Sequence, residues 1–315
     1  CHGDLHLDNI ALIDEEPLLF DGIEFNNDFR WIDVISDLSF LLIDLDFRKH
    51  KSASLKVLSL YLSKTLDYNS LFLLNFYRVY RAMVRAKITT LRGMQLEDNS
   101  LQQQQVIQIA KDYINQAATY LVPKRRPKCI LLQGVSGSGK SHLAGQMIDE
   151  LELNAIALNS DRIRKSLFGI DANERVDKSK VSSLYSAEMN RKTYRALEHH
   201  SAIILENGFD VIVDATFIKA EHRQRFYQLA AKHKIDCYLI CIEASIERAS
   251  QSILDRQLLN YNPSDADINV MHRQQAHLEP PTESEDAMVL NASDLRVNFP
   301  KSQLQDFLKL PITDL

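Results

Sequence analysis

The sequence predicts an α/β protein in two parts: a mostly helical first part, and a second part in which helices flank a parallel sheet. Three observations predict this. From about residue 52 to residue 121, apolar residues recur at helical spacing with almost no glycine or proline. After residue 128, apolar runs typical of strands alternate with helical patterns, an order that favours a parallel sheet covered on both faces. The 315 residues also suffice for two domains.

The first domain is expected to occupy residues 1–121. Short apolar runs between acidic residues at 1–47 predict a small hairpin followed by a helix, and several packed helices should follow. Residues 122–128 contain two prolines and four basic residues, as solvated linkers do, and nucleic-acid binding is the less favoured interpretation. Arg78, Arg81 and Arg85 should lie on one helical face, with Lys87 close by. A solvent-exposed basic face is favoured over an anion site.

Five strands are expected in the second domain, residues 129–315. The apolar runs that predict them are 130–132, 155–158, 211–213, 238–242 and 288–290. In sheets of this kind, ligands bind outside the carboxyl ends of the strands. Polar residues that directly follow these runs are therefore the first candidates for a functional site.

Composition and charge restrict the classes of function. The formal net charge of -5 gives no general attraction to nucleic acid or to an anionic membrane. The four cysteines have no zinc-type or disulfide-framework spacing, which suits reduced thiols and a cytoplasmic protein. No apolar run of the sequence approaches the ~20 residues of a membrane span. Because the chain begins with Cys1 and not with methionine, we expect an amino-terminally truncated piece of a longer protein.

Residues 134–141 read Gly-Val-Ser-Gly-Ser-Gly-Lys-Ser and fit the Walker A pattern between a predicted strand and a helical stretch. In such a loop, backbone N–H groups curl around phosphates. Lys140 would reach the β and γ phosphates as a point charge, and the Ser141 hydroxyl would ligate magnesium. The pattern therefore predicts binding of ATP with Mg²⁺. The predicted nucleotide ligands are Gly134, Ser136, Gly137, Ser138, Gly139, Lys140 and Ser141.

Two carboxylates follow predicted strands of this domain. Asp214 ends the third strand, and we interpret it as a second magnesium ligand, with a simple turn residue as the alternative. Asp161 follows the second strand and would accept the proton of an acceptor hydroxyl. Arg164 shares a helix face with Asp161 and would orient it or bind an anionic substrate. The alternative is that Ser160 or Asp161 only caps the helix that follows.

An arginine after the fourth predicted strand completes this set. Arg256 lies in the polar stretch 247–267, where a lid would bring a guanidinium over the phosphates. Arg248 would serve equally well. The alternative for either residue is an ordinary surface arginine.

From residue 129 to about residue 300, the chain resembles the AAA_33-type P-loop kinases, which include polynucleotide-kinase-like and gluconate-kinase-like enzymes. The resemblance rests on the Walker A loop, Ser160-Asp161 with Arg164, Val213-Asp214-Ala215-Thr216, and Ser264-Asp265-Ala266. It implies that Asp161 acts on the acceptor hydroxyl. In this family the helix before Ser264 often carries two arginines four residues apart, whereas here Ser252 stands four residues before Arg256.

The first nine residues, Cys-His-Gly-Asp-Leu-His-Leu-Asp-Asn, place a carboxylate five residues before an amide, as in the catalytic loop of protein kinases. In that arrangement Asp4 would accept the substrate proton and Asn9 would hold a magnesium ion. Asp21, which ends a predicted strand, stands where the second metal-binding aspartate belongs. His2 and His6 are interpreted as loop packing, because a zinc site would need further ligands.

This pattern resembles the signature of the aminoglycoside phosphotransferase family, with Asp37-Leu38-Ser39 in the place of an Asp-Leu-Ala-like segment. The resemblance implies that Asp4 is the base and that Asn9 and Asp21 are metal ligands. It covers only residues 1 to about 120, a partial kinase-like carboxy-terminal lobe. The part that would cover the ATP phosphates is missing, so this lobe is predicted to be inactive alone.

Together, the two parts resemble bacterial proteins described as bifunctional aminoglycoside phosphotransferase/ATP-binding proteins. We therefore expect an ATP-dependent phosphotransferase that moves the γ-phosphoryl group to a hydroxyl of a small molecule or, less favoured, of a nucleic-acid end. The family name does not identify the acceptor, because one fold hosts many. The alternative is a nucleotide-dependent switch or binding module without chemistry. Catalysis is expected from Asp161, Lys140, Arg164 and Arg256, and no membrane partner is expected.

Overall fold

The computed structural model describes residues 1–122, 125–171, 174–258 and 264–310. The chain forms two compact units. The first comprises Cys1–Leu62 and Asp67–Arg125, and the second comprises Ser63–Leu66 and the chain from Arg126 onward. The division after Arg125 falls within the predicted linker, of which residues 123 and 124 lie outside the described ranges.

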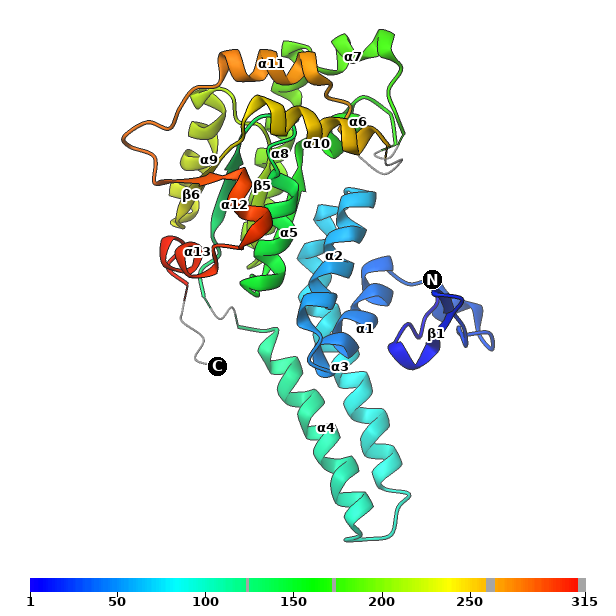
Figure 1. Cartoon of the computed structure of the whole chain (residues 1–315). Helices are drawn as coiled ribbons and strands as arrows, with labels where there is room; N and C mark the ends of the chain where they lie inside the picture. Colours follow the sequence, from blue (N-terminus) through cyan, green and yellow to red (C-terminus); the bar gives the residue numbers. More distant parts are fainter. Residues whose placement is uncertain (123–124, 172–173, 259–263, 311–315) are drawn as a thin grey trace. The chain divides into compact units, whose positions relative to one another are not determined.

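The first unit begins with a hairpin and continues with helices (Figure 1). Strands β1 (Ile10–Ile13) and β2 (Glu16–Leu19) pair antiparallel. The helices are α1 (Val34–Phe47), α2 (Lys51–Thr65), α3 (Leu71–Gly93) and α4 (Leu101–Thr119), with 3-10 turns at Leu7–Asn9, Asn27–Arg30 and Tyr68–Ser70. A buried apolar cluster joins α1, α3 and α4: Phe40, Ile43, Ala82 and Ala117.

The side chains of Arg78 and Arg81 on α3 pack inside this unit. The prediction of a solvent-exposed basic face is therefore wrong for these two residues. Arg78 is buried, and its guanidinium lies 5.3 Å from the ring centroid of Tyr120. Arg81 lies 5.1 Å from the ring centroid of Phe40 and donates to two backbone carbonyls of the unit. Aromatic rings on neighbouring helices attract the guanidinium groups, and helical spacing alone does not reveal such partners.

Five parallel strands form the sheet of the second unit, in the order β4-β5-β3-β6-β7. They are β3 (Cys129–Gln133), β4 (Ala155–Asn159), β5 (Asp210–Asp214), β6 (Cys237–Glu243) and β7 (Ala287–Asn291), and each contains one of the predicted apolar runs. All residues of β3 and β5 are buried, which requires cover on both faces of the sheet. The predicted parallel sheet is therefore confirmed.

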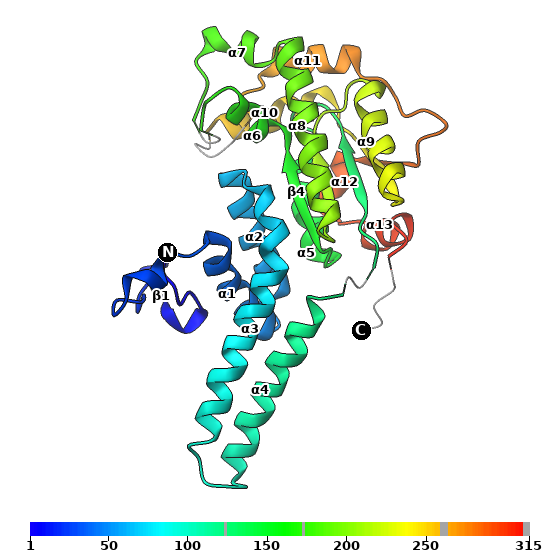
Figure 2. The ribbon, with the colours of Figure 1, turned by 180° about the vertical axis from the view of Figure 1, so that it is seen from behind.

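Helices cover both faces of this sheet. In Figure 1, α5 (Lys140–Glu150) and α12 (Ala292–Val297) lie in front of the strands, whereas in Figure 2, seen from behind, α8 (Ala187–Glu206) and α9 (Ala220–His233) do. The other helices are α6 (Ser160–Leu167), α7 (Lys178–Leu184), α10 (Ile246–Leu258), α11 (Ile268–His277) and α13 (Lys301–Phe307). None of the described helices is long and apolar enough to cross a membrane.

The strand order brings the candidate residues to one edge. The chain leaves β3 toward β4 on one side and later returns to β6 on the other, so the carboxyl end of β3 is a topological switch point. Asp214 at the end of β5 is in register with Asn159 of β4 and with Leu132 of β3. The loop after β3 and the polar ends of β4 and β5 therefore meet.

Candidate active site

The Walker A loop connects β3 to α5 at this edge. Gly134 follows the strand directly, and a Cβ atom there would lie 2.8 Å from the carbonyl oxygen of Ile242, so only glycine fits. The Lys140 ammonium donates to the carbonyl oxygens of Gly134 at 2.9 Å and Val135 at 2.8 Å, so it lies across its own loop. Burial lowers the pKa of Lys140, while nearby carboxylates oppose that shift.

Asp214 receives two side-chain hydrogen bonds at the end of β5. The Ser141 hydroxyl donates to its Oδ2 atom at 2.5 Å, and the Asn159 amide donates to the same atom at 2.7 Å. Burial raises the pKa of the Asp214 carboxyl, although both hydrogen bonds and the Lys140 charge act in the opposite direction. The structure thus brings together the two predicted magnesium ligands of this unit.

The donor set at Asp214 fits magnesium. Mg²⁺ prefers oxygen ligands and is usually held by one or two carboxylates together with substrate phosphates. Asp214 and Ser141 would supply a carboxylate and a hydroxyl, and their contact shows that both oxygens reach the same place. Residues 1–122, 125–171, 174–258 and 264–310 contain no group of three or more His, Cys, Asp or Glu side chains that could hold a metal. An ion at Asp214 would therefore complete its coordination with substrate oxygens and water.

Asp161 lies in the first turn of α6. The helix cap is Asn159, whose side chain accepts from the backbone N–H groups of Asp161 and Arg162, both at 3.1 Å. The interpretation of Ser160 or Asp161 as the cap is therefore wrong. The side-chain oxygen of Asn159, one residue before Ser160, already accepts from the first free N–H groups of the helix.

Arg164 holds the Asp161 carboxylate, as their spacing predicts. Its Nη1 atom lies 2.5 Å from the Asp161 Oδ1 atom, and its Nη2 atom donates to the Asn190 side chain at 3.2 Å. The guanidinium also lies 4.8 Å from the ring centroid of Tyr185. With partners on three sides, Arg164 has little freedom to turn and can fix the direction of the carboxylate.

A cavity of about 850 Å³ adjoins these residues. Its lining includes Ser136 of the Walker A loop, the Asp161 and Arg164 pair, and Arg256 of α10. Arg248 is not among the described residues that line it, so the structure favours Arg256 of the two arginines. Burial lowers the pKa of Arg256, which sets it apart from an ordinary surface arginine. Residues 259–263 of the predicted lid lie outside the described ranges.

Sequence reasoning missed several residues of this cavity. Tyr194 of α8 stacks on His222 of α9 with ring centroids 3.9 Å apart, and its hydroxyl accepts from the backbone N–H of Phe217 at 3.0 Å. Aromatic residues at helical spacing indicate a core, so no local pattern marks Tyr194. Asn159, which contacts Asp214 and does not line the cavity, was also missed. It had a usable signal, because an amide at the end of a strand and two residues before Asp161 is a typical helix cap.

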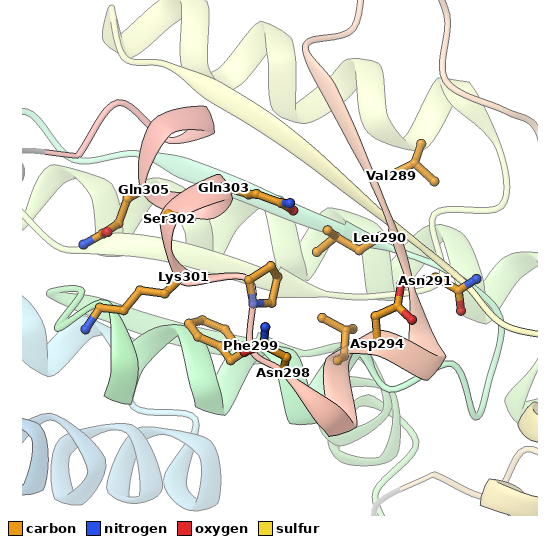
Figure 3. Close-up of a pocket in the computed structure, with 12 residues that line it drawn as sticks. Val289, Leu290, Asn291, Asp294, Asn298, Phe299, Lys301, Ser302, Gln303 and Gln305 are labelled. Carbon is orange, nitrogen blue, oxygen red and sulfur yellow. The ribbon is translucent and has the colours of Figure 1, made fainter.

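A second cavity, of about 580 Å³, lies beside β7, α12 and α13 (Figure 3). Its lining includes Asn291, Asn298 and Lys301, whose side chains are exposed. None of the predicted site residues lines it, and it is remote in sequence from the Walker A loop.

The kinase-like loop of the first unit brings Asp4 and Asn9 together. The Asn9 side-chain amide donates to the Asp4 backbone carbonyl at 2.9 Å and to the Asp4 carboxylate at 3.3 Å. A hydrogen bond from His6 is the largest of the causes that lower the pKa of Asp4. Asp37 accepts from two backbone N–H groups of this loop, at 2.7 and 3.0 Å, and so fixes its shape.

Asp21 has fewer contacts with the kinase-like loop than Asn9 has. The backbone N–H of Phe20 donates to the Asn9 carbonyl at 3.1 Å, which places the end of β2 beside the loop. Asp21 itself is exposed and has a left-handed backbone, with φ of 56°. Among the described residues, no side-chain hydrogen bond joins it to Asp4 or Asn9, so its role as a metal ligand stays a prediction.

The glycine-rich loop, the buried Lys140 and the Ser141–Asp214 pair at the carboxyl edge of a parallel sheet define a P-loop nucleotide-binding domain. Residues 129–281 match the AAA_33 family model, described as AAA domain. The part of the chain that contains the Walker A loop is thus similar to the AAA_33 family, which its motifs predict. The resemblance of the first unit to aminoglycoside phosphotransferases stays a prediction.

The known proteins that are similar to this chain include a relative similar in sequence over most of the chain and two kinases whose structures match a little over half of it. The uncharacterized protein Mb2027c of Mycobacterium bovis is 31% identical over 232 residues, which are 73% of this chain and 44% of that protein. The chain thus spans less than half the length of this curated relative. A gluconokinase from Sinorhizobium meliloti has 17% identity and a TM-score of 0.41, over 59% of this chain and 98% of its own. The Mycobacterium tuberculosis APS kinase CysC, in complex with AMPPNP and APS, has 19% identity and a TM-score of 0.41, over 58% and 98%.

Proposed function

We propose that the second unit is an ATP-dependent kinase that transfers the γ-phosphoryl group to a hydroxyl of an acceptor. The observation that carries this proposal is the ion pair between Asp161 and Arg164 in the lining of a cavity that the Walker A loop also lines. A carboxylate held in a fixed direction beside a phosphate-binding loop has the chemistry of a general base. A site that only bound nucleotide would have no use for it.

Each side chain has a role set by its position. Backbone N–H groups of the Walker A loop and the Lys140 ammonium bind the phosphates, and Ser141 and Asp214 would hold Mg²⁺. A bound Mg²⁺ would supply positive charge that offsets the charge of the phosphates. Asp161 takes the hydroxyl proton as the acceptor oxygen bonds to the γ phosphorus and the bond from that phosphorus to the ADP oxygen breaks. Arg256 stabilises the negative charge on the transferred group.

The cavity suits a small acceptor. Its volume of about 850 Å³ lies in the range of small-molecule sites, roughly 300–1,000 Å³. The net charge of -5 offers no general attraction to nucleic acid, which favours a small molecule over a nucleic-acid end. The Nε atom of Arg164 is buried and has no hydrogen-bond partner among the described residues, so an acceptor oxygen would satisfy it.

The test measures ATP consumption by the full-length protein with a panel of hydroxylated metabolites and 5′-hydroxyl oligonucleotides. Asp161→Asn should lower turnover by about 100-fold or more, because the base is lost, while the Kd for ATP stays within about twofold. Lys140→Ala is the control that should lose both turnover and ATP binding. Equal turnover in Asp161→Asn would refute the base, and ATP binding without turnover in the wild type would favour a nucleotide-dependent switch.

We further propose that the first unit is the carboxy-terminal lobe of an aminoglycoside phosphotransferase-like domain, so that the whole protein is bifunctional. The hydrogen bonds between Asn9 and Asp4 support this proposal. Asp4 would be the base, and Asn9 and Asp21 would hold a second Mg²⁺. The distinguishing measurement on the full-length protein is an ATP turnover that survives Lys140→Ala and is lost in Asp4→Asn. If no such turnover exists with any acceptor, the first unit is not a second kinase.

A further inference from the structure

Both a hydrogen bond and apolar packing tie the Walker A loop to the two helices that follow β6. The backbone N–H of Ser136 donates to the Oε1 atom of Gln274 on α11 at 2.8 Å. A buried apolar cluster joins the same segments: Val135 of the loop, Ala249 and Ile253 of α10, and Met271 of α11. Helices α10 and α11 also contact each other, as Figure 1 shows. The loop and the two helices therefore form one packed group.

The approach of α10 to the loop is so close that it excludes a side chain. Gly137 has a left-handed backbone, with φ of 85°, and a Cβ atom there would lie 2.4 Å from the carbonyl oxygen of Ala249. Any other residue at this position would push the helix away from the loop. Small changes in how α10 and α11 are anchored should therefore alter the distance between helix and phosphate-binding loop.

This anchoring bears on Arg256. Ile253 of the cluster stands three residues before Arg256 on α10, so a helix held at Ile253 carries Arg256 in a fixed direction. Arg256 and Gln274 line the same cavity as Asp161. A guanidinium acts on a transferred phosphoryl group only if its supporting elements hold it within about 0.5 Å of the productive position.

We propose that Gln274 is a positioning residue for phosphoryl transfer: it anchors α11, and through the apolar cluster α10, to the Walker A loop so that Arg256 faces the transferred group. The inference rests on the proposed kinase function. A glutamine suits this role because its neutral amide oxygen satisfies the Ser136 N–H, while the other N–H groups of the Walker A loop remain available to the phosphates. A carboxylate in the same place would repel the phosphates, and an apolar side chain would leave the N–H unpaired.

The main variant is Gln274→Met, which keeps the length of the side chain and removes the acceptor oxygen. The matched control is Gln275→Met, because Gln275 is exposed on the same helix and does not line the cavity. In Gln274→Met, kcat should fall about 10-fold while the KM for ATP changes by less than about twofold, since Arg256 acts mainly in the transition state. Gln275→Met should keep wild-type kinetics.

Two kinetic results would overturn the proposal. An unchanged kcat in Gln274→Met would show that the anchor has no catalytic consequence. A higher kcat with tighter ATP binding would show that Gln274 obstructs the loop instead of supporting it.

Arg256→Ala supplies the coupling test. If Gln274 acts through Arg256, adding Gln274→Met to Arg256→Ala should lower kcat by less than about twofold further. In an Arg248→Ala background, the loss of about 10-fold should remain in full. Fully additive losses with Arg256→Ala would indicate a general packing defect and would contradict the positioning role.

A measurement that needs no catalysis separates this inference from the kinase proposal. Amide hydrogen exchange in peptides covering residues 134–139 and 268–277 should be faster in Gln274→Met and unchanged in Gln275→Met. Gln274→Glu keeps an acceptor, so its exchange should stay near that of the wild type while the KM for ATP rises. If the wild type turns over no acceptor, the kinase proposal fails. The exchange measurement alone then tests whether Gln274 anchors α11 to the Walker A loop. Unchanged exchange in Gln274→Met, or fast exchange in Gln274→Glu, would overturn the anchor.

Discussion

Asp37 in the first unit and Asp214 in the second are buried aspartates beside the candidate sites, and the donors around the two carboxylates differ. Asp37 is 6% exposed and accepts backbone N–H groups of the loop that contains Asp4. Asp214 is 4% exposed and accepts from the side chains of Ser141 and Asn159. Backbone donors are fixed by the course of the chain, whereas a hydroxyl and an amide can rotate to other partners. Asp37 therefore shapes its loop, and Asp214 is the carboxylate that is available to a cation.

The two sites also differ in enclosure. In the second unit, the Asp161 and Arg164 pair lines a cavity together with the Walker A loop. In the first unit, the hairpin beside Asn9 presents apolar side chains to solvent, with Leu12 73% and Leu19 51% exposed. An enclosed site strengthens electrostatic interactions with a substrate, because water is excluded. The kinase proposal for the second unit accordingly has the stronger physical support.

Substitution of Asp37 should cause the largest loss of stability. Asp37→Ala leaves two backbone N–H groups of the loop without their acceptor, so the first unit should lose about 3 kcal/mol of unfolding free energy. Urea unfolding followed by far-ultraviolet circular dichroism measures this, and Asp112→Ala, an exposed position on α4, should change the free energy by less than about 0.5 kcal/mol. A loss as small as in the control would mean that Asp37 does not hold the loop.

Features that depend on neighbours in the sequence could be predicted. The five strands follow from apolar runs, because strands of a covered parallel sheet are buried along their length. The ion pair of Asp161 with Arg164 follows from their spacing on a helix. The contact of Asn9 with Asp4 agrees with their spacing in a known type of loop.

Features that depend on distant partners could not be predicted. Gln274 meets Ser136 only because α11 packs beside a loop more than a hundred residues earlier, and no local pattern marks that glutamine. The same holds for Arg78. Its helical spacing predicts exposure, but Tyr120, the residue that follows α4, packs against its guanidinium. Such contacts follow from tertiary packing, which the hydrophobic pattern specifies in outline but not side chain by side chain.

Substitution of Asp214 should change the stability less, and in the opposite direction. Burial raises the pKa of its carboxyl above the ordinary 3.8, so the folded protein binds this proton more tightly than the unfolded chain does. The resulting stabilisation is present below pH 3.8 and is lost as the pH rises through the raised pKa. Above the raised pKa, the ionised carboxylate therefore costs stability. Asp214→Asn should raise the unfolding free energy without nucleotide by about 1 kcal/mol, as thermal unfolding would show.

The same carboxylate should make ATP binding depend on pH. A protonated carboxyl ligates cations poorly, so the affinity of the wild type for ATP with Mg²⁺ should fall as the pH is lowered through the raised pKa of Asp214. Asp214→Asn should bind ATP with Mg²⁺ more weakly and show a flatter pH profile by titration calorimetry, whereas Asp306→Asn, at an exposed position on α13, should follow the wild type. If Asp214→Asn instead destabilised the protein by as much as Asp37→Ala, both aspartates would be structural. That result would refute the assignment of a cation to Asp214. The hydrogen bonds from Ser141 and Asn159 to Asp214 would then be as important to the fold as those from the backbone N–H groups to Asp37.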